Sequence, residues 1–540
     1  MLLKVLKVTR HLLRSSWFRL SLDAHKQHIS VYTLLLLVEL SVKFQGAWCN
    51  THESRGNFLI TGDARGCVPY TVDNQVLACV CNATYCDSAA NYDSQALEDG
   101  ISYWYVTNKQ GLRMTMSETK YGNCKRSATH ATVQVDTTET YQEILGFGGA
   151  FTDSAGMNIA KLSPATQKQL LRTYYDPKTG SRYNLGRIPI GGTDFSIRPY
   201  TYDDFKGDVT LKHFALQEED LKFKIPYAKK ALKLNPDTKF FSAAWSAPGW
   251  MKTNGEFFGF GYLKKQYYQV YANYLVKFLE GYRKNGLEIW AITTGNEPTI
   301  YFEIHTSVIS MGWTPQSMAR WVGSFMGPTL EKSRHNDTLI LALDDDKFLL
   351  PGYVIPTYTH AKSNKYTAGT AVHAYFENYA PASVLTETHE AFPNKFILMT
   401  EDSIDKDQVT KSWNYGESYI YTDRDYLNNW AVGWVDWNLV LDESGGPTWV
   451  NNTLNAPIIV NPSADEFYKM PMYYAIQHFN CPRSRFENRD IETYNNPLIN
   501  DLFSCCSGTL STQITLKDSR KKTLCLDLTP NSMNTVIYKN

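Results

Sequence analysis

Short apolar runs alternate with longer amphipathic segments through the middle of this 540-residue chain, from residue 141 to residue 439. This alternation is typical of repeated β-strand and α-helix units, in which each buried strand is followed by a helix that packs one apolar face against the sheet. Eight apolar runs have the length and composition of strands, which predicts an α/β fold, a (β/α)8 TIM barrel. The expected strands are Glu143–Gly148, Arg182–Pro189, Lys239–Trp245, Glu288–Thr293, Thr338–Leu343, Gly369–Ala374, Phe396–Thr400 and Val432–Trp437.

Two of the connecting helices show clear local signals. Residues Tyr267 to Lys284 carry tyrosine, leucine and phenylalanine at steps of three and four, with charged residues on the opposite side. We expect this aromatic stripe in the core. A second helix is expected to begin at Ser163 and Pro164, because serine caps helix N-termini and proline fits the first helical position.

The segments on either side of the barrel are rich in threonine, valine, asparagine and proline and show little helical periodicity, which indicates β structure. Neither segment is large enough to fold well alone, so we expect them to pair. The expected division is a small disulfide-containing β domain from residues 64–94 and 440–478, and a β-sandwich domain from residues 95–140 and 479–540.

The N-terminal residues 1–48 resemble a targeting segment. A basic stretch precedes a short apolar run, Tyr32 to Val42, which Glu39 interrupts and which is shorter than the about 18 residues of a membrane span. A cleaved signal peptide and a retained signal anchor both fit, and both predict entry into the secretory pathway.

Charge excludes one class of partner. The chain has 54 basic and 54 acidic residues, with no basic patch beyond the N-terminus. Nucleic-acid binding depends on a basic surplus or patch, so no nucleic-acid partner is expected.

Cysteine spacing also indicates an oxidising compartment. Cys67, Cys79, Cys81 and Cys86 lie within 20 residues, a density that indicates either disulfides or a metal site. We favour disulfides and expect no metal, because the one-residue gap between Cys79 and Cys81 is too tight for a zinc knuckle. Cys49, Cys124, Cys481, Cys505, Cys506 and Cys525 have no assigned partners. Glycosylation sequons occur at Asn82, Asn336 and Asn451.

Reactive side chains in such barrels collect where strands end at the C-terminal mouth. Glu297 follows the fourth strand and Glu401 follows the seventh, so the two carboxylates are expected to face each other. One carboxylic acid that protonates a glycosidic oxygen, and one carboxylate that attacks the anomeric carbon, form the machinery of a retaining glycosidase. Glu297 would then need a raised pKa, and Glu401 would need to stay ionised near donors such as Arg187.

Polar and aromatic residues follow the other strands and would surround this pair. Asn296 is placed to donate to a sugar 2-hydroxyl, although it could also cap its loop. The remaining candidates could bind sugar hydroxyls or form the walls of a sugar pocket, or serve as core residues and loop caps. They are Asp194, Trp245, His373, Tyr375 and Trp437.

These residues carry a resemblance to glycoside hydrolase family 30, in particular to its glucosylceramidases, from about Arg65 to Phe479. The most specific stretches are Cys79–Ser88, Gly146–Ala150, Asp194–Arg198, Trp250–Asn254, Asn296–Pro298, Leu343–Asp345, Trp434–Asn438 and Gly445–Trp449.

The resemblance implies a barrel with two flanking β domains, lysosomal residence, no metal or other cofactor, and a glycolipid substrate presented at a membrane surface with a saposin-like activator protein. It implies Glu297 as acid/base and Glu401 as nucleophile. It implies disulfides Cys67–Cys79 and Cys81–Cys86. The implied glucose contacts are Asp194, Trp245, Asn296 and Trp437.

Four positions depart from the glucosylceramidase pattern: Gly295 replaces a glutamate, Asp346 a glutamine, Ala374 an aromatic residue and Asp402 a small apolar residue. These departures leave two alternatives to a glucosylceramidase open. One is a related β-glycosidase with another sugar preference, and the other is a glycolipid-binding pseudoenzyme. No oligomeric state follows from the sequence.

Overall fold

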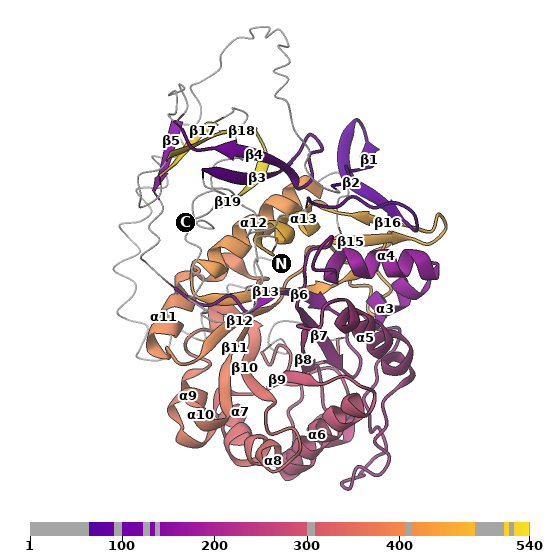
Figure 1. Cartoon of the computed structure of the whole chain (residues 1–540). Coiled ribbons are helices and arrows are strands. Elements are labelled where there is room, and N and C mark those ends of the chain that lie inside the picture. Colours follow the sequence, from indigo (N-terminus) through magenta and orange to yellow (C-terminus); the bar gives the residue numbers. More distant parts are fainter. Residues whose placement is uncertain are drawn as a thin grey trace, which may run out of the picture. The chain divides into compact units, whose positions relative to one another are not determined.

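A closed eight-stranded parallel barrel forms the centre of the fold in a computed structural model, which describes residues 64–90, 100–122, 130–134, 141–299, 308–406, 412–480, 512–517 and 523–538 (Figure 1). This confirms the predicted TIM barrel. Each strand pairs in parallel with the next, and the last pairs with the first. The strands are β6 (Gly146–Ala150), β7 (Leu185–Ile190), β8 (Lys239–Ala244), β9 (Ile289–Thr293), β10 (Leu339–Asp346), β11 (Thr367–His373), β12 (Phe396–Glu401) and β13 (Ala431–Asn438).

Several strands have ends that differ from the predicted ones. The fifth strand was expected to stop at Leu343, but β10 continues through three aspartates to Asp346, and all three are buried. The pattern of apolar residues cannot locate this end of the strand. The aspartates are polar, and they are buried because adjacent strands of the barrel lie beside them. The eighth strand likewise extends to Asn438, and the sixth ends at His373 rather than Ala374.

Helices follow the barrel strands along the chain (Figure 1). α4 begins at Pro164 with the Ser163 side chain accepting from the Thr166 N–H, as predicted. α6 spans Tyr268–Lys284 and buries its aromatic stripe. It begins one residue after the expected start, Tyr267. The barrel helices are α3 (Asp153–Ala160), α4 (Pro164–Tyr175), α5 (Ile225–Leu234), α6 (Tyr268–Lys284), α7 (Pro315–Trp321), α8 (Gly327–Glu331), α9 (Ile355–Thr359), α10 (Ala361–Tyr366), α11 (Ser383–Ala391) and α12 (Ser412–Leu427).

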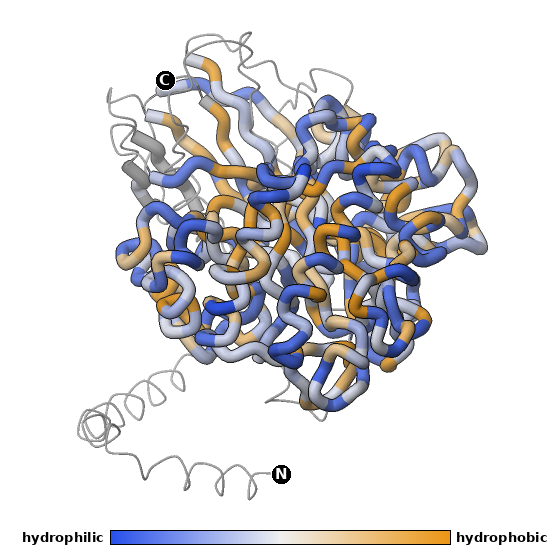
Figure 2. Tube along the Cα trace, turned by 90° about the horizontal axis from the view of Figure 1, so that it is seen from below, coloured by the Kyte–Doolittle hydropathy of each residue, from blue (hydrophilic) through white to orange (hydrophobic). Residues whose placement is uncertain are grey.

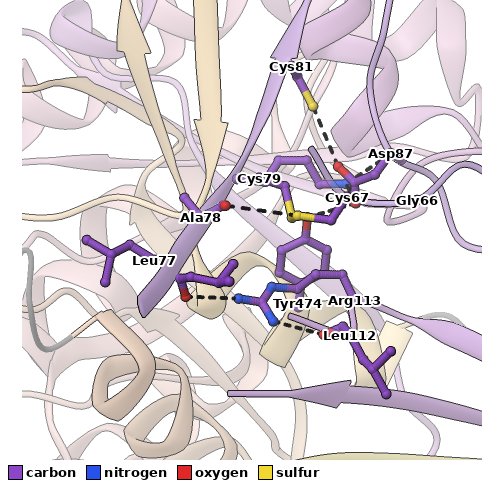
Figure 3. Close-up of a disulfide and its surroundings, with 12 residues drawn as sticks. Gly66, Cys67, Leu77, Ala78, Cys79, Cys81, Asp87, Leu112, Arg113 and Tyr474 are labelled. Atoms are coloured by element: carbon purple, nitrogen blue, oxygen red, sulfur yellow. Dashed lines mark hydrogen bonds and ion pairs between the residues drawn. A yellow bond between two sulfur atoms is a disulfide. The ribbon is translucent and has the colours of Figure 1, made fainter. Parts of the chain in front are cut away.

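One flanking sheet combines strands from the two sides of the barrel sequence, in the order β1-β2-β16-β15-β14. The disulfides Cys67–Cys79 and Cys81–Cys86 lie in or beside it. Figure 3 shows the first of them together with Arg113 and Tyr474. The Arg113 guanidinium lies 5.4 Å from the centre of the Tyr474 ring. The strands are β1 (Pro69–Val72), β2 (Gln75–Asn82), β14 (Val440–Asp442), β15 (Ile458–Asn461) and β16 (Glu466–Lys469).

Two further three-stranded sheets also join N-terminal and C-terminal segments, in the orders β18-β17-β5 and β19-β3-β4. The pairing of distant segments follows the expected organisation, but the exact domain limits stay a prediction. The strands are β3 (Ile101–Asn108), β4 (Thr115–Lys120), β5 (His130–Gln134), β17 (Thr512–Lys517), β18 (Thr523–Leu528) and β19 (Ser532–Tyr538).

The expectation of β structure after residue 440 is wrong for α13 (Pro471–Asn480), which is a helix. All ten of its residues are buried, including Gln477, His478 and Asn480. The helix has only ten residues, and periodicity alone does not distinguish a short, fully buried helix from a buried strand.

The targeting segment, residues 1–48, lies outside the described residues, as do Cys49, Cys124, Cys481, Cys505 and Cys506. Among the residues that the structure does describe, no helix is both long and apolar enough to cross a membrane. Figure 2 shows hydrophilic and hydrophobic residues interleaved along the chain rather than separated into long blocks.

Candidate active site

Glu297 and Glu401 meet at the C-terminal mouth of the barrel. Glu401 is the last residue of β12, and Glu297 lies in the loop that follows β9. One carboxylate oxygen of each residue and a ring nitrogen of His373 all lie within 4.8 Å of one another. The barrel thus brings together two carboxylates from different strands.

Glu401 is held by two donors. The Arg187 guanidinium, from β7, forms an ion pair with Oε2, and the Tyr375 hydroxyl donates to Oε1 at 2.7 Å. The Arg187 side chain is fully buried, so its charge acts on Glu401 with little solvent screening. Each oxygen of Glu401 therefore contacts a fixed donor.

Glu297 is held as a neutral acid. Burial, with smaller contributions from the carboxylates of Glu401 and Asp345, raises its pKa to about 8 against the lowering effect of His373. His373 Nδ1 lies 3.1 Å from Glu297 Oε1. The backbone at Glu297 has a φ of 42°, and its N–H donates to the Asp344 carbonyl at 2.8 Å. The loop thus fixes a carboxylic acid that is protonated at acidic and neutral pH.

Trp245 and Trp437 form one wall of the site. Their rings stack with centroids 5.1 Å apart, and Arg187 lies 4.9 Å and 5.4 Å from the two ring centres. Asn296 Oδ1 accepts from Arg187 Nη2 at 2.7 Å, which turns its amide NH2 group away from the guanidinium as a donor. The structure therefore places the predicted residues Arg187, Trp245, Asn296 and Trp437 in one cluster.

Asp194 lies in the loop after β7, and burial raises its pKa to about 7, with a further contribution from the Glu401 charge. Asn452 donates to Asp194 Oδ2 at 2.7 Å, and Thr448 donates to the Asp194 carbonyl at 2.8 Å. Sequence reasoning missed Asn452. The nearby stretch Gly445–Trp449 could have pointed to it, because this stretch belongs to the family resemblance although it lies after the barrel in sequence.

Asp344 was also missed as a candidate. It is fully buried beneath the site, and its carboxylate accepts from Arg187 Nη2 at 2.9 Å and lies 3.2 Å from His373 Nε2. Burial alone would raise its pKa, but Arg187 and His373 lower it well below the usual range. The signal available in the sequence was the run of three aspartates at the end of β10.

The departures from the glucosylceramidase pattern surround this cluster. Burial raises the pKa of Asp402 well above its usual range, as do the charges of Asp436, Asp423 and Glu377. These surroundings therefore favour the neutral form of Asp402 over a second charge beside Glu401. Asp346 accepts from the backbone N–H groups of the two residues after Ala374, at 3.0 Å and 3.3 Å.

Two clusters among the described residues have ligand atoms close enough for a cation, Glu297-His373-Glu401 and Cys81-Cys86-Asp87. The first already holds the Arg187 charge, and both cysteines of the second form a disulfide. Neither donor set favours a resident metal.

A parallel barrel with a neutral carboxylic acid and an arginine-paired carboxylate facing each other across its mouth is the arrangement of a glycoside hydrolase. Residues 144–482 match the glycosyl hydrolase family 30 TIM-barrel domain. The chain belongs to glycoside hydrolase family 30 and is a glycosidase.

Its relatives include Putative glucosylceramidase 3 of Caenorhabditis elegans, 38% identical over 500 residues, which cover 88% of this chain and 95% of that protein. Lysosomal acid glucosylceramidase of Mus musculus is 39% identical over 427 residues, which cover 77% of this chain and 82% of that protein. The crystal structure of SrfJ from Salmonella typhimurium has the same fold, with a TM-score of 0.72 and 23% identity over 82% of this chain and all of that one.

Proposed function

We propose that the protein is a retaining β-glucosidase that hydrolyses glucosylceramide-like lipids to glucose and ceramide. The observation that carries this proposal is the different setting of two close carboxyl groups: burial keeps Glu297 protonated, while Glu401 pairs with the Arg187 cation and accepts from Tyr375. One oxygen of Glu297 and one of Glu401 lie within 4.8 Å of each other, which favours the about 5 to 5.5 Å between the carboxyl groups of retaining enzymes over the about 6.5 Å or more of inverting ones.

In the first step, Glu297 transfers its proton to the glycosidic oxygen, and the aglycone leaves as an alcohol. Glu401 attacks the anomeric carbon as this bond breaks and forms a glucosyl-enzyme ester. Asn296 donates to the sugar 2-hydroxyl, a contact that strengthens as positive charge develops on the ring. The stacked Trp245 and Trp437 supply apolar faces for the sugar.

In the second step, the ionised Glu297 removes a proton from a water molecule, which attacks the same carbon and releases Glu401. Two inversions give net retention and restore both carboxyl groups to their starting states. An alcohol such as a sterol can replace this water, in which case the glucose is transferred rather than released.

The relatives support this choice of substrate and location. Two of them are called glucosylceramidases, and the mouse relative is called lysosomal. We therefore place the protein in the secretory pathway and the lysosome, where it acts on glycolipid at a membrane surface with help from a saposin-like activator. The raised pKa of Glu297 suits an acidic compartment, because the acid form is fully populated there.

Hydrolysis of an aryl β-glucoside at acidic pH by the wild type and by Glu401→Gln tests this function, with the anomer of the released glucose read by NMR. β-Glucose released first, and turnover lost in a folded variant, are the expected results. α-Glucose released first would refute retention, and equal turnover by Glu401→Gln would refute the assigned nucleophile.

Gly295 and Ala374 favour one second candidate, a β-glycosidase of the same family with a different sugar. Both positions lack the side chains found in glucosylceramidases, and they are next in sequence to the site residues Asn296 and His373. A panel of aryl xylosides, galactosides and glucosides distinguishes the two, since the preferred sugar has the highest kcat/KM. Binding of glycolipid without hydrolysis of any member of the panel would instead identify a pseudoenzyme.

A further inference from the structure

Asp344 occupies an unusual backbone conformation beneath the catalytic pair. Leu343 and Asp344 have φ values of 75° and 67°, in a region that residues other than glycine rarely occupy. The pairing of β10 with β11 shifts register at the same point. Such strain persists only where the surrounding contacts maintain it, and it is concentrated at functional sites.

The Asp344 carboxylate collects donors from four other barrel strands. Oδ1 accepts from the Thr400 hydroxyl at 2.8 Å and faces His373 Nε2 at 3.2 Å. Oδ2 accepts from the Thr293 hydroxyl at 2.8 Å and from Arg187 Nη2 at 2.9 Å. These donors come from β12, β11, β9 and β7.

Two of these donors continue to the catalytic carboxylates. The other terminal nitrogen of Arg187 binds Glu401, and the other ring nitrogen of His373 lies 3.1 Å from Glu297. The Asp344 backbone carbonyl adds a third connection, because it accepts from the Glu297 N–H at 2.8 Å. One buried carboxylate thus contacts the partners of both reacting groups.

We infer that Asp344 is a positioning residue for both catalytic carboxylates: it orients the Arg187 guanidinium onto Glu401 and the His373 imidazole onto Glu297. The inference deepens the proposed function and rests on its assignment of Glu297 and Glu401. Asp344 touches neither the substrate nor the reacting atoms.

The connection through His373 has a specific chemical consequence. Burial opposes the charge on His373, but Glu401, Glu297 and Asp344, which accepts a hydrogen bond from Nε2–H, favour the imidazolium, so the pKa of His373 lies well above its usual range. An imidazolium donates its Nδ1–H to Glu297 Oε1. The acidic proton of Glu297 must then reside on its other oxygen, Oε2, which is left to donate to the glycosidic oxygen.

The connection through Arg187 acts on the nucleophile. The guanidinium is planar and donates in fixed directions, so an acceptor on Nη2 sets the direction in which Nη1 meets Glu401. An amide at position 344 presents an NH2 group to one of these donors. The neutral amide therefore attracts the Arg187 guanidinium and the His373 imidazolium less strongly than the carboxylate does, and it orients at least one of these two side chains less well.

Asp344→Asn tests the inference. On an aryl β-glucoside, we expect kcat to fall by about 100-fold, the loss typical of a misplacement near 1 Å, while KM changes little. The matched control is Asp423→Asn, which removes a buried carboxyl from α12 and is expected to leave kcat and KM unchanged. A folded Asp344→Asn with the kcat of the wild type would overturn the inference.

Substrates with different leaving groups separate the two connections. His373→Gln breaks only the connection to the acid, so its kcat/KM should recover on a dinitrophenyl glucoside, whose leaving group needs no proton. Asp344→Asn also affects the nucleophile, so its loss should persist on that substrate. Full recovery of kcat/KM by Asp344→Asn on the dinitrophenyl glucoside would refute the claim that Asp344 orients Arg187 onto Glu401.

A spectroscopic measurement does not depend on turnover. In protein labelled with 15N-histidine, with the His373 signal assigned from His373→Gln, Nε2 should carry a proton at acidic and neutral pH. In Asp344→Asn the imidazolium should lose its charge at lower pH than in the wild type. An unchanged titration, or a wild-type Nε2 without a proton, would overturn the inference even if Asp344→Asn does not fold or the wild type cleaves no glucoside.

Discussion

The buried carboxyl group of Asp436 predicts how the stability of the barrel depends on pH. It lies on β13, and its Oδ1 accepts from the Tyr419 hydroxyl at 2.8 Å and the Trp437 N–H at 3.0 Å, while Oδ2 is buried with no hydrogen-bond partner among the described residues. Burial raises its pKa from 3.8 to about 8, against the lowering effect of these two hydrogen bonds. The folded protein therefore holds a proton that the unfolded chain has lost at neutral pH.

The sign and size of the effect follow from this difference. Between the two pKa values the native state binds more protons than the unfolded state, so the free energy of unfolding decreases as pH rises. One such group contributes about 1.4 kcal/mol per pH unit, or roughly 3 kcal/mol between about pH 5 and pH 7.5. Asp436→Asn removes this contribution while keeping a similar shape, so it should narrow the stability difference between the two pH values by up to roughly 3 kcal/mol.

Thermal unfolding at the two pH values measures this difference. For the about 400 residues that the structure describes, the unfolding entropy converts roughly 1 kcal/mol into about 1 °C. The Tm gap between acidic and neutral pH should thus be about 3 °C smaller in Asp436→Asn than in the wild type. Asp337→Asn, an exposed change of the same kind, is the control and should leave the gap unchanged. An Asp436→Asn gap equal to that of the wild type would show that Asp436 is already ionised in the native state.

Three further predictions concern the acid, the disulfides and the sequons. The alkaline limb of the pH profile of kcat/KM should lie near pH 8, because activity is lost as Glu297 deprotonates at its raised pKa. This limb should be absent from the residual activity of Glu297→Gln. A limb that is unchanged in Glu297→Gln would mean that another group causes it. Replacing the Cys67–Cys79 pair by serines should cost about 3 kcal/mol and the shorter Cys81–Cys86 loop about 2 kcal/mol, measured by denaturant unfolding; the reverse order would contradict the loop-entropy reasoning. Asn336→Gln should increase gel mobility after expression in the secretory pathway, because Asn336 is exposed; an unchanged mobility would mean an unused sequon.

The site depends on contacts that cross the whole chain. Asp194 binds Asn452, which lies between the strands of the flanking sheet in sequence, 258 residues away. Arg187 and Asp344 are 157 residues apart. No local pattern marks such pairs, because closure of the barrel and docking of the flanking segment create them. The same closure buries Glu297 and so raises its pKa. The sequence indicated that the proposed reaction needs a protonated Glu297, but the burial that keeps it protonated appears only in the folded barrel.

The sequence by itself determined the order of strands and helices and the two glutamates, because apolar periodicity is a local property and parallel strands all end at the same mouth. It also carried the disulfide pairing, through the resemblance. Only the tertiary structure decided that Pro471–Asn480 is a helix, that β10 continues through its aspartates, and that Asp344 lies between Arg187 and His373. In each of these cases the polar groups find their partners on distant elements, and hydrogen bonds between distant elements leave no period in the sequence.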